Sequence, residues 1–410
     1  MPFITPSGWG LALLVASWAP VAWAQDGDDA PPLAAEDAVV AALAGAPDVR
    51  AAEARLREAR GLLSQSALFL RNPTVDASLG IDGERFEIEA LQPLSLTGEG
   101  WFARRTGRTR IEAAEAALRR VRLETAAAAR RVYVEAVART RLAEFGADAS
   151  ELAHRLREAV ARKYDVGEAS LLDLRLARMN EVAAASDALG ARGEEVEALR
   201  ELAVTIRRPV TSAALISGVL AAVPAPDEPD EPLPRSDVLA ARAAVEAAEA
   251  QLAWQRAAAV PPVAVGAFVE REDGTLSAGP ALSVTLPVFD RNQVGRASAL
   301  GQLAVAEAEA EAVEARAETE RVTAADRLAE ARATIEMLGG DLEAEARAAL
   351  DSIEAGYRAG ELDLATAVLL QTEVLEGLRA TVLLQRRLAE ARLDLLLALE
   401  DDALLAGGDR

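Results

Sequence analysis

The feature that most constrains this chain is a helical pattern of unusual length, from about Gly100 to about Ala161. Small and apolar residues recur there at intervals of three and four, the spacing of a coiled-coil seam: Ile111, Ala114, Leu118, Val121, Thr125, Ala128 and Val132. At ~1.5 Å per residue, a helix of about 60 residues is about 90 Å long. No compact globular domain needs such a helix, so we expect a rod.

A pair of short strands is expected directly before this helix. Apolar and polar residues alternate over Thr74–Ile81, which is the period of a strand with unlike faces. Asp82-Gly83 is typical of a hairpin turn, and alternation resumes from Phe86. The pattern predicts a strand hairpin at about 73–94, with one apolar face formed by Val75, Ala77, Leu79 and Ile81.

The same order of elements occurs a second time. A hairpin at about 262–289 is followed by a helical pattern from Val294 to Glu354, and its last strand is expected to have an apolar face of Leu282, Val284, Leu286 and Val288. Three motif pairs match at similar spacings: Asp48-Val49 with Asp237-Val238, Pro93 with Pro287, and Tyr164-x-x-Gly167-Glu168 with Tyr357-x-x-Gly360-Glu361. These matches indicate an internal duplication.

The duplication predicts the domain organisation. The first repeat covers residues 25–206 and the second covers 236–405, each with a helix, a strand hairpin, a long helix, a Tyr-x-x-Gly turn and a return helix. Residues 207–235 are rich in proline and acidic residues and are predicted to be a linker, and residues 406–410 form a tail.

Residues 1–24 are predicted to be a signal peptide. The apolar stretch Trp9–Val21 ends in Ala22-Trp23-Ala24, a small-x-small cleavage pattern. A retained membrane anchor is the alternative, but Pro20 interrupts the stretch, which is short for a span of about 20 residues. The chain contains no cysteine, which excludes disulfides, thiolate metal sites and a cysteine-linked lipid.

Composition and motifs argue against several functional classes. The net charge of −22 disfavours nucleic acid as a partner, because binding it needs a basic surface. There is no Ser/His/Asp set, phosphate loop or Cys/His cluster, so we predict no catalytic residue, cofactor or metal site, and no enzyme. His154, the single histidine, is expected to be exposed and without a role.

The number of strands raises a question of assembly. Four strands of about 9–11 residues cannot close a membrane barrel, since the smallest such barrels have about eight strands. Open strand edges are too costly in hydrocarbon. Either the strands lie in water, or several chains pool them into one barrel. The export signal and the very long helices favour pooling.

These residues resemble the TolC-like outer-membrane efflux family (outer membrane factors), especially its heavy-metal-exporter branch. The resemblance is carried by the motifs LPVFDRNQ (Leu286–Gln293) and QPLSLTG (Gln92–Gly98), the two Tyr-x-x-Gly turns and the closing helix Leu370–Leu399. It implies a mainly α fold with a small β part. Three identical chains would pool twelve strands into an outer-membrane β-barrel, continued by a long antiparallel coiled-coil α-barrel across the periplasm.

The resemblance also implies site residues. The tip motif, which in the family closes the tunnel and meets the adaptor, is matched by Tyr164, Gly167, Tyr357 and Gly360. Asp173 falls where the family can carry a gate-lining acid, whereas the second repeat has Thr366 there and Asp363 three residues earlier. Both glycines are also expected to be helix C-caps. The strand-to-helix junctions are expected to be shaped by Pro93, Pro287, Asp290, Arg291 and Asn292.

The implied function is a passive exit duct in the outer membrane, working with a periplasmic adaptor (membrane fusion) protein and an inner-membrane efflux pump. Asp76, Glu87 and Glu89 are expected to face the lumen and favour cations. The branch suggests divalent metal cations, but drugs or solvents would use the same design, so the substrate stays open. The alternative is a periplasmic coiled-coil adaptor or scaffold without a pore, which would carry one helical hairpin flanked by compact β-rich domains.

Overall fold

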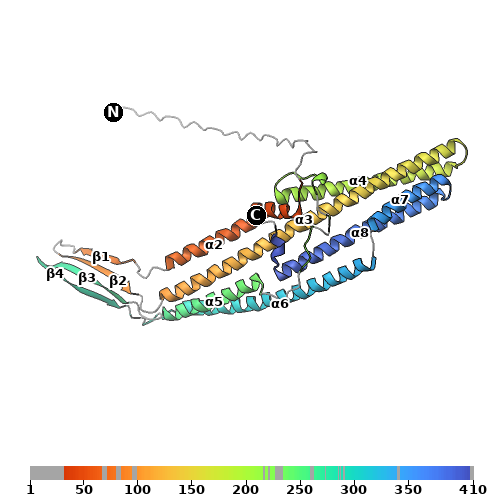
Figure 1. The fold of residues 1–410 in the computed structure, drawn as a ribbon. Coiled ribbons are helices and arrows are strands. Elements are labelled where there is room, and N and C mark those ends of the chain that lie inside the picture. Colours follow the sequence, from red (N-terminus) through yellow and green to blue (C-terminus); the bar gives the residue numbers. More distant parts are fainter. Residues whose placement is uncertain are drawn as a thin grey trace, which may run out of the picture.

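Long helices form a rod that ends in a small curved β-sheet (Figure 1). The computed structural model describes residues 32–66, 72–79, 85–94, 99–215, 218–219, 222–226, 234–258, 263–272, 274–284, 286, 288–289, 291–338 and 342–406. The predicted signal peptide and the hairpin turn at Asp82-Gly83 lie outside these residues.

The helices of the first half follow the periodicity closely. They are α1 (Ala35–Gly45), α2 (Pro47–Ser66), α3 (Glu99–Asp165) and α4 (Leu171–Ile206). α2 begins at Pro47, since proline fits the first helical position, where its missing N–H costs nothing. The predicted long helix is confirmed, at 67 residues.

The second half departs from the prediction within its long helix. Its helices are α5 (Ser236–Ala257), α6 (Gln293–Leu338), α7 (Leu342–Ala359) and α8 (Leu364–Leu399). The single helix predicted from Val294 to Glu354 is wrong, since α6 ends before Gly339-Gly340 and α7 begins after them; glycine weakens a helix. The return helix stops at Leu399 because Glu400 takes a left-handed conformation, with φ 54°, before the short 3₁₀ helix η2 (Asp402–Leu405).

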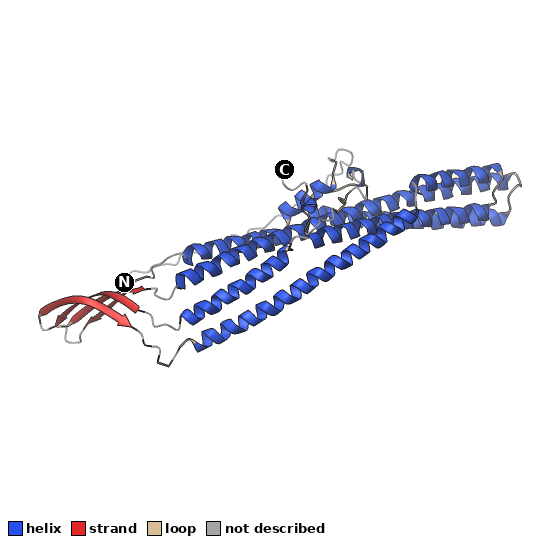
Figure 2. Ribbon diagram, turned by 60° about the horizontal axis from the view of Figure 1, so that its bottom comes forward, coloured by secondary structure: helices blue, strands red, loops and turns tan. Residues whose placement is uncertain are grey.

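The strands form one antiparallel sheet in the order β1-β2-β3-β4 (Figure 2). They are β1 (Thr74–Leu79), β2 (Phe86–Leu94), β3 (Val263–Glu272) and β4 (Thr275–Val284). β2 pairs with β3, so the hairpins of the two halves join into one surface. Within the described part of the chain, no helix is both long enough and apolar enough to cross a membrane.

The last strand is shorter than its alternating pattern predicts. β4 ends at Val284, which pairs with Val263 at the start of β3, so Leu286 and Val288 have no strand partner. The Val288 N–H donates instead to the Leu286 carbonyl over 2.9 Å, which closes a tight turn. The apolar row assigned to this strand is therefore correct only for Leu282 and Val284.

Two helices of the second half, α8 and α5, meet end to end beside α3. Glu400, just after α8, accepts a hydrogen bond from the Ser236 backbone N–H over 2.8 Å, at the first residue of α5. A carboxylate is favourable there because it satisfies a free N–H at the positive end of the helix dipole. Glu400 is buried and also lies 3.5 Å from a guanidinium nitrogen of Arg120 on α3. This joint fixes α8 and α5 to the long helix.

The described part of the predicted linker packs against the helices at the middle of the rod. Val219, Ala222 and Val223 are buried in a cluster with α1, α3 and η2. Arg130 of α3, with only 1% of its surface exposed, donates to the Ala222 carbonyl over 2.9 Å and to carbonyls of Ala403, Leu404 and Ala406. Proline and acidic content alone does not reveal this packing.

Candidate functional site

The sheet has one apolar face. Residues opposite each other in antiparallel strands point to the same side, so the register assigns each residue to a face. The pairs Val75–Ala90, Ala90–Ala267 and Val265–Leu282 lie on one side. That face also holds Ala77, Leu79, Ile88, Val269, Ala278 and Val284. It is suited to hydrocarbon.

The opposite face carries a patch of acids. Asp76 is directly opposite Glu89, and Glu87 is directly opposite Glu270. Among the strand residues of this face none is Lys or Arg, and Arg85, just before β2, pairs with Glu272. Carboxylates opposite each other repel and create a negative electrostatic potential at this face. That potential favours a nearby cation without requiring it to be bound. Glu270 was not among the predicted lumen acids, because its place depends on pairing between the two halves.

The strand-to-helix junction of the second half is tied to α5. Asn292 takes a left-handed conformation, with φ 58°, and donates from Nδ2 to the Gln255 carbonyl over 2.9 Å. Asparagine tolerates this conformation better than most residues. The Arg291 N–H donates to Gln293 Oε1 over 2.8 Å. Pro93 lies within β2 opposite Ala264, while Pro287 and Asp290 lie outside the described residues.

The two Tyr-x-x-Gly turns have the same backbone geometry at the far end of the rod. Gly167 and Gly360 have φ of 81° and 76°, the left-handed conformation that favours glycine. The N–H of each donates to the carbonyl of its tyrosine, over 3.0 Å to Tyr164 and 3.2 Å to Tyr357. Both glycines are thus helix C-caps as expected, and both turns join antiparallel helices (Figure 1).

The acids at the two turns play different local roles. Asp173 and Ser170 form a capping box at the start of α4, in which Asp173 Oδ2 accepts from the Ser170 N–H over 2.9 Å. Asp363 is itself the N-cap of α8 and accepts from the Thr366 N–H over 2.7 Å. Hydrogen bonds from Ser170 lower the pKa of Asp173. Within one chain, its carboxylate is held by a serine rather than by a cation.

The structure brings a residue to the tips that the sequence does not single out. Lys163, the only lysine of the chain, donates from Nζ to the Tyr357 carbonyl over 3.2 Å and lies 4.5 Å from the centre of its ring. Tyr357 is 5% exposed whereas Tyr164 is 39% exposed. Burial, and then the nearby Asp173, raise the pKa of the Tyr357 hydroxyl. Asp173, Tyr357 and Lys163 therefore form one cluster, and Tyr164 stands outside it.

A family model and several solved structures of outer-membrane proteins resemble this chain. Residues 233–400 match the family model "Outer membrane efflux protein". The resemblance to the outer-membrane efflux family is confirmed. VceC of Vibrio cholerae, an outer membrane protein, is 20% identical, with a TM-score of 0.70 over 89% of this chain and 95% of that chain.

Two further structures have the same fold. CusC is 17% identical with a TM-score of 0.71, over 89% of this chain and 91% of that one. The CmeC outer membrane channel of Campylobacter jejuni is 17% identical with a TM-score of 0.68, over 91% and 86%. No curated protein matches the chain significantly. The heavy-metal-exporter branch stays a prediction.

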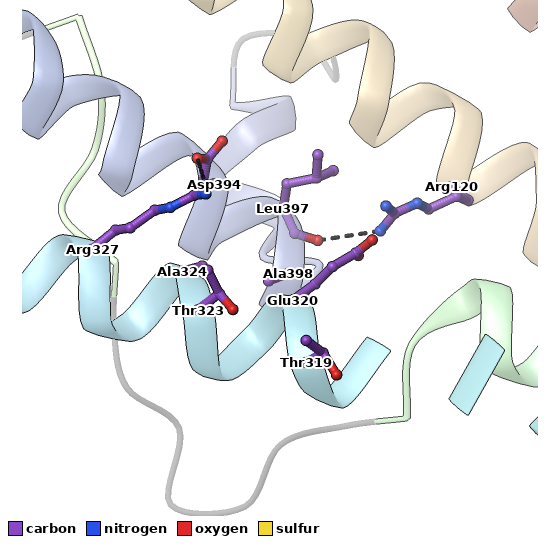
Figure 3. Close-up of a pocket in the computed structure, with 9 residues that line it drawn as sticks. All are labelled: Arg120, Thr319, Glu320, Thr323, Ala324, Arg327, Asp394, Leu397 and Ala398. Atoms are coloured by element: carbon purple, nitrogen blue, oxygen red, sulfur yellow. Dashed lines mark hydrogen bonds and ion pairs between the residues drawn. The ribbon is translucent and has the colours of Figure 1, made fainter. Parts of the chain in front are cut away.

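A cavity of ≈ 350 Å³ lies in the middle of the helical rod, between α3, α6 and α8 (Figure 3). Arg327 and Asp394 point toward each other across it, 3.6 Å apart, and Arg120 donates to the Leu397 carbonyl over 3.3 Å. Because its charges already have partners in the protein, the cavity is a packing feature rather than a candidate ligand site.

His154, which was expected to have no role, makes a contact between two helices. Its Nδ1 lies 2.7 Å from Glu181 Oε1 on α4, and Arg157 donates to the same carboxylate over 3.1 Å. Hydrogen bonding to His154 is the largest cause of the lowered pKa of Glu181. The histidine side chain is 46% exposed, as expected, but it bridges the two helices of the first hairpin.

Proposed function

We propose that three copies of this chain form the outer-membrane exit duct of a tripartite efflux pump, performing no chemistry. The observation that supports this most is a four-stranded sheet, apolar on one face and acidic on the other, continuing into a helix of 67 residues. The apolar face meets lipid, the acidic face lines water, and the helices extend the passage across the periplasm to the adaptor and inner-membrane pump.

The need for several copies follows from the sheet edges. β1 and β4 each pair on one side only among the described residues, so a single sheet leaves open edges that hydrocarbon does not tolerate. Pairing β4 of one copy with β1 of the next removes every edge. The resemblance to the efflux family implies three copies, which give the twelve strands of the proposed barrel.

Extraction and oligomeric state test this function. We expect the exported protein to remain in outer membranes after a high-salt wash, to need detergent for release, and to be a trimer in detergent. A periplasmic adaptor or scaffold would be released by salt or be soluble. A monomer that is soluble without detergent would refute the duct.

We expect the duct to prefer cations because of the acids on the polar face of the sheet. Asp76→Asn with Glu87→Gln, Glu89→Gln and Glu270→Gln removes four charges per chain and should abolish the preference in reversal-potential measurements under a salt gradient. Arg271→Gln, on the apolar face, is the matched control and should leave selectivity unchanged. Anion preference of the wild type at neutral pH would contradict the idea.

The substrate proposal rests on the same charges. Divalent metal cations would be favoured by the acidic lumen without being bound, and drugs or solvents remain alternatives that the pump would select. Among the described residues, no group of three or more His, Asp or Glu side chains could hold a metal ion.

The tip residues Tyr164, Gly167, Asp173, Tyr357 and Gly360 are proposed to form the gate and the adaptor contact. Asp173→Ala should raise conductance and antibiotic leakage, because the acid would pair across the closed tip. Asp363→Ala is the matched control: it also removes a helix cap, at the equivalent place of the second turn. Equal behaviour of Asp173→Ala and wild type would end the gate assignment for Asp173.

A further inference from the structure

A groove with an apolar floor and a basic rim runs beside the last turns of α4. Its volume is ≈ 940 Å³, and its floor is formed by Val196, Leu199, Ala203, Val204, Pro209 and Val210. The remaining lining includes four arginines: Arg192, Arg200, Arg207 and Arg208. No acid is among the described residues that line it. For a chain of net charge −22, this is an unusual local surface.

Most of this basic charge is not neutralised within the described structure. Arg192 pairs with Glu195 of its own helix. In contrast, the side chains of Arg200, Arg207 and Arg208 make no hydrogen bond or ion pair with any described residue, although that of Arg207 packs against Gly45. Three guanidinium groups above an apolar floor suit an acidic peptide segment, whose carboxylates accept charge-assisted hydrogen bonds.

The N-terminal part of the described chain starts at the mouth of this groove. The Leu33 N–H donates to the Ala214 carbonyl over 2.8 Å, and Leu33 pairs with Leu215 in a parallel bridge. Leu33 is 1% exposed and is thus firmly anchored. Ser212, two residues before Ala214, lines the groove. Leu33 therefore anchors the N-terminal end of the described chain next to the groove lining.

The sequence at that point has matching charge and length. Gln25–Pro32 contains Asp26, Asp28 and Asp29 and no basic residue. An extended segment of eight residues reaches about 26 Å. The stretch of α4 from Arg192 to Arg207 is roughly 22 Å long at the helical rise. Pro31-Pro32 also favours an extended course.

We propose that the acidic segment 25–32 of the exported chain docks into the arginine groove beside α4. Its aspartates pair with Arg200, Arg207 and Arg208, and Ala30 and Pro31 lie on the apolar floor. The docked segment covers an apolar groove that would otherwise face the periplasm. This inference does not depend on the duct, since it concerns contacts within one chain.

Disulfide trapping tests the docking cleanly because the chain has no cysteine of its own. Gly27→Cys keeps every aspartate and is combined with Val196→Cys on the groove floor. The matched control combines Gly27→Cys with Glu201→Cys on the exposed side of the same helix. Removing the negative charge of Glu201 reduces repulsion of the acidic segment. It can therefore only raise the cross-linking rate of the control pair. In the full exported chain, the groove pair should cross-link within one chain roughly tenfold faster than the control, because docking raises the effective concentration.

Charge variants complete the test. Arg200→Gln with Arg208→Gln should reduce the cross-linking rate several-fold, whereas Arg175→Gln with Arg178→Gln, on the same helix outside the groove, should not. Equal rates for the groove and control pairs would overturn the proposal. So would cross-links mainly between chains, which would assign the groove to a neighbouring copy, or insensitivity to loss of Arg200 and Arg208. Labelling of Val196→Cys alone shows whether the groove is formed in each variant.

Discussion

Arg130→Met is expected to lower the free energy of unfolding by about 3–5 kcal/mol. The Arg130 guanidinium is 1% exposed and donates to four backbone carbonyls, of Ala222, Ala403, Leu404 and Ala406. Its only described carboxylate partner is Glu36, 3.7 Å away. Methionine fills much of the volume but leaves these carbonyls without donors in a buried place. The loss should therefore far exceed that of a surface ion pair.

The neighbouring arginine provides the control for Arg130→Met. Arg131 pairs with Asp394 over 2.7 Å, and its side chain is 40% exposed. Arg131→Met should cost about 0–1 kcal/mol, as exposed ion pairs do. Guanidinium unfolding followed by circular dichroism, at fixed protein and detergent concentration, compares the two. Proteolysis between residues 207 and 235 should also be faster in Arg130→Met only. Similar losses in both variants would show that Arg130 does not hold this segment.

The elements of this fold follow from periodicity, but their ends do not. The helical period predicts a rod from Gly100 to Ala161, and the structure has α3 at Glu99–Asp165. Such a seam repeats along the chain itself, so it is visible without knowing what packs against it. The end of β4 is different, because it is set by where β3 begins. Leu286 and Val288 keep the alternating pattern without being paired.

Contacts between the two halves are the part of the candidate site that the sequence does not reveal. Glu270 joins the acidic face only through pairing with Glu87, and Lys163 reaches Tyr357 from the other turn. Each is a single charged residue in a charged sequence, with no local pattern to mark it. The motif residues Tyr164 and Tyr357 look equivalent in sequence, yet one is exposed and the other buried. Duplication preserves the motif but not its surroundings.

Lys163→Met is expected to have the second large effect, opening the resting duct. The ammonium group hydrogen-bonds the Tyr357 carbonyl near the negative C-terminal end of α7 and lies over the Tyr357 ring. Together these contacts are worth about 1–2 kcal/mol per chain, allowing for partial exposure of the lysine. If opening of the proposed trimer breaks all three copies at once, the closed state loses about 3–6 kcal/mol, a factor of roughly 10² to 10⁴ in the closed-to-open ratio.

Single-channel recording and uptake of a large hydrophilic antibiotic would measure this opening. Lys163→Arg keeps a cation near the ring and should open less than Lys163→Met. Arg162→Met is the matched control, because Arg162 is the adjacent base, has a side chain that is 66% exposed, and among the described residues forms an ion pair with Glu158 of its own helix. It should leave the duct closed. If the duct opens equally in Lys163→Met and Arg162→Met, the effect comes from lost surface charge. If the duct stays closed in Lys163→Met, the contacts that keep it closed lie between copies and not between the two turns of one chain.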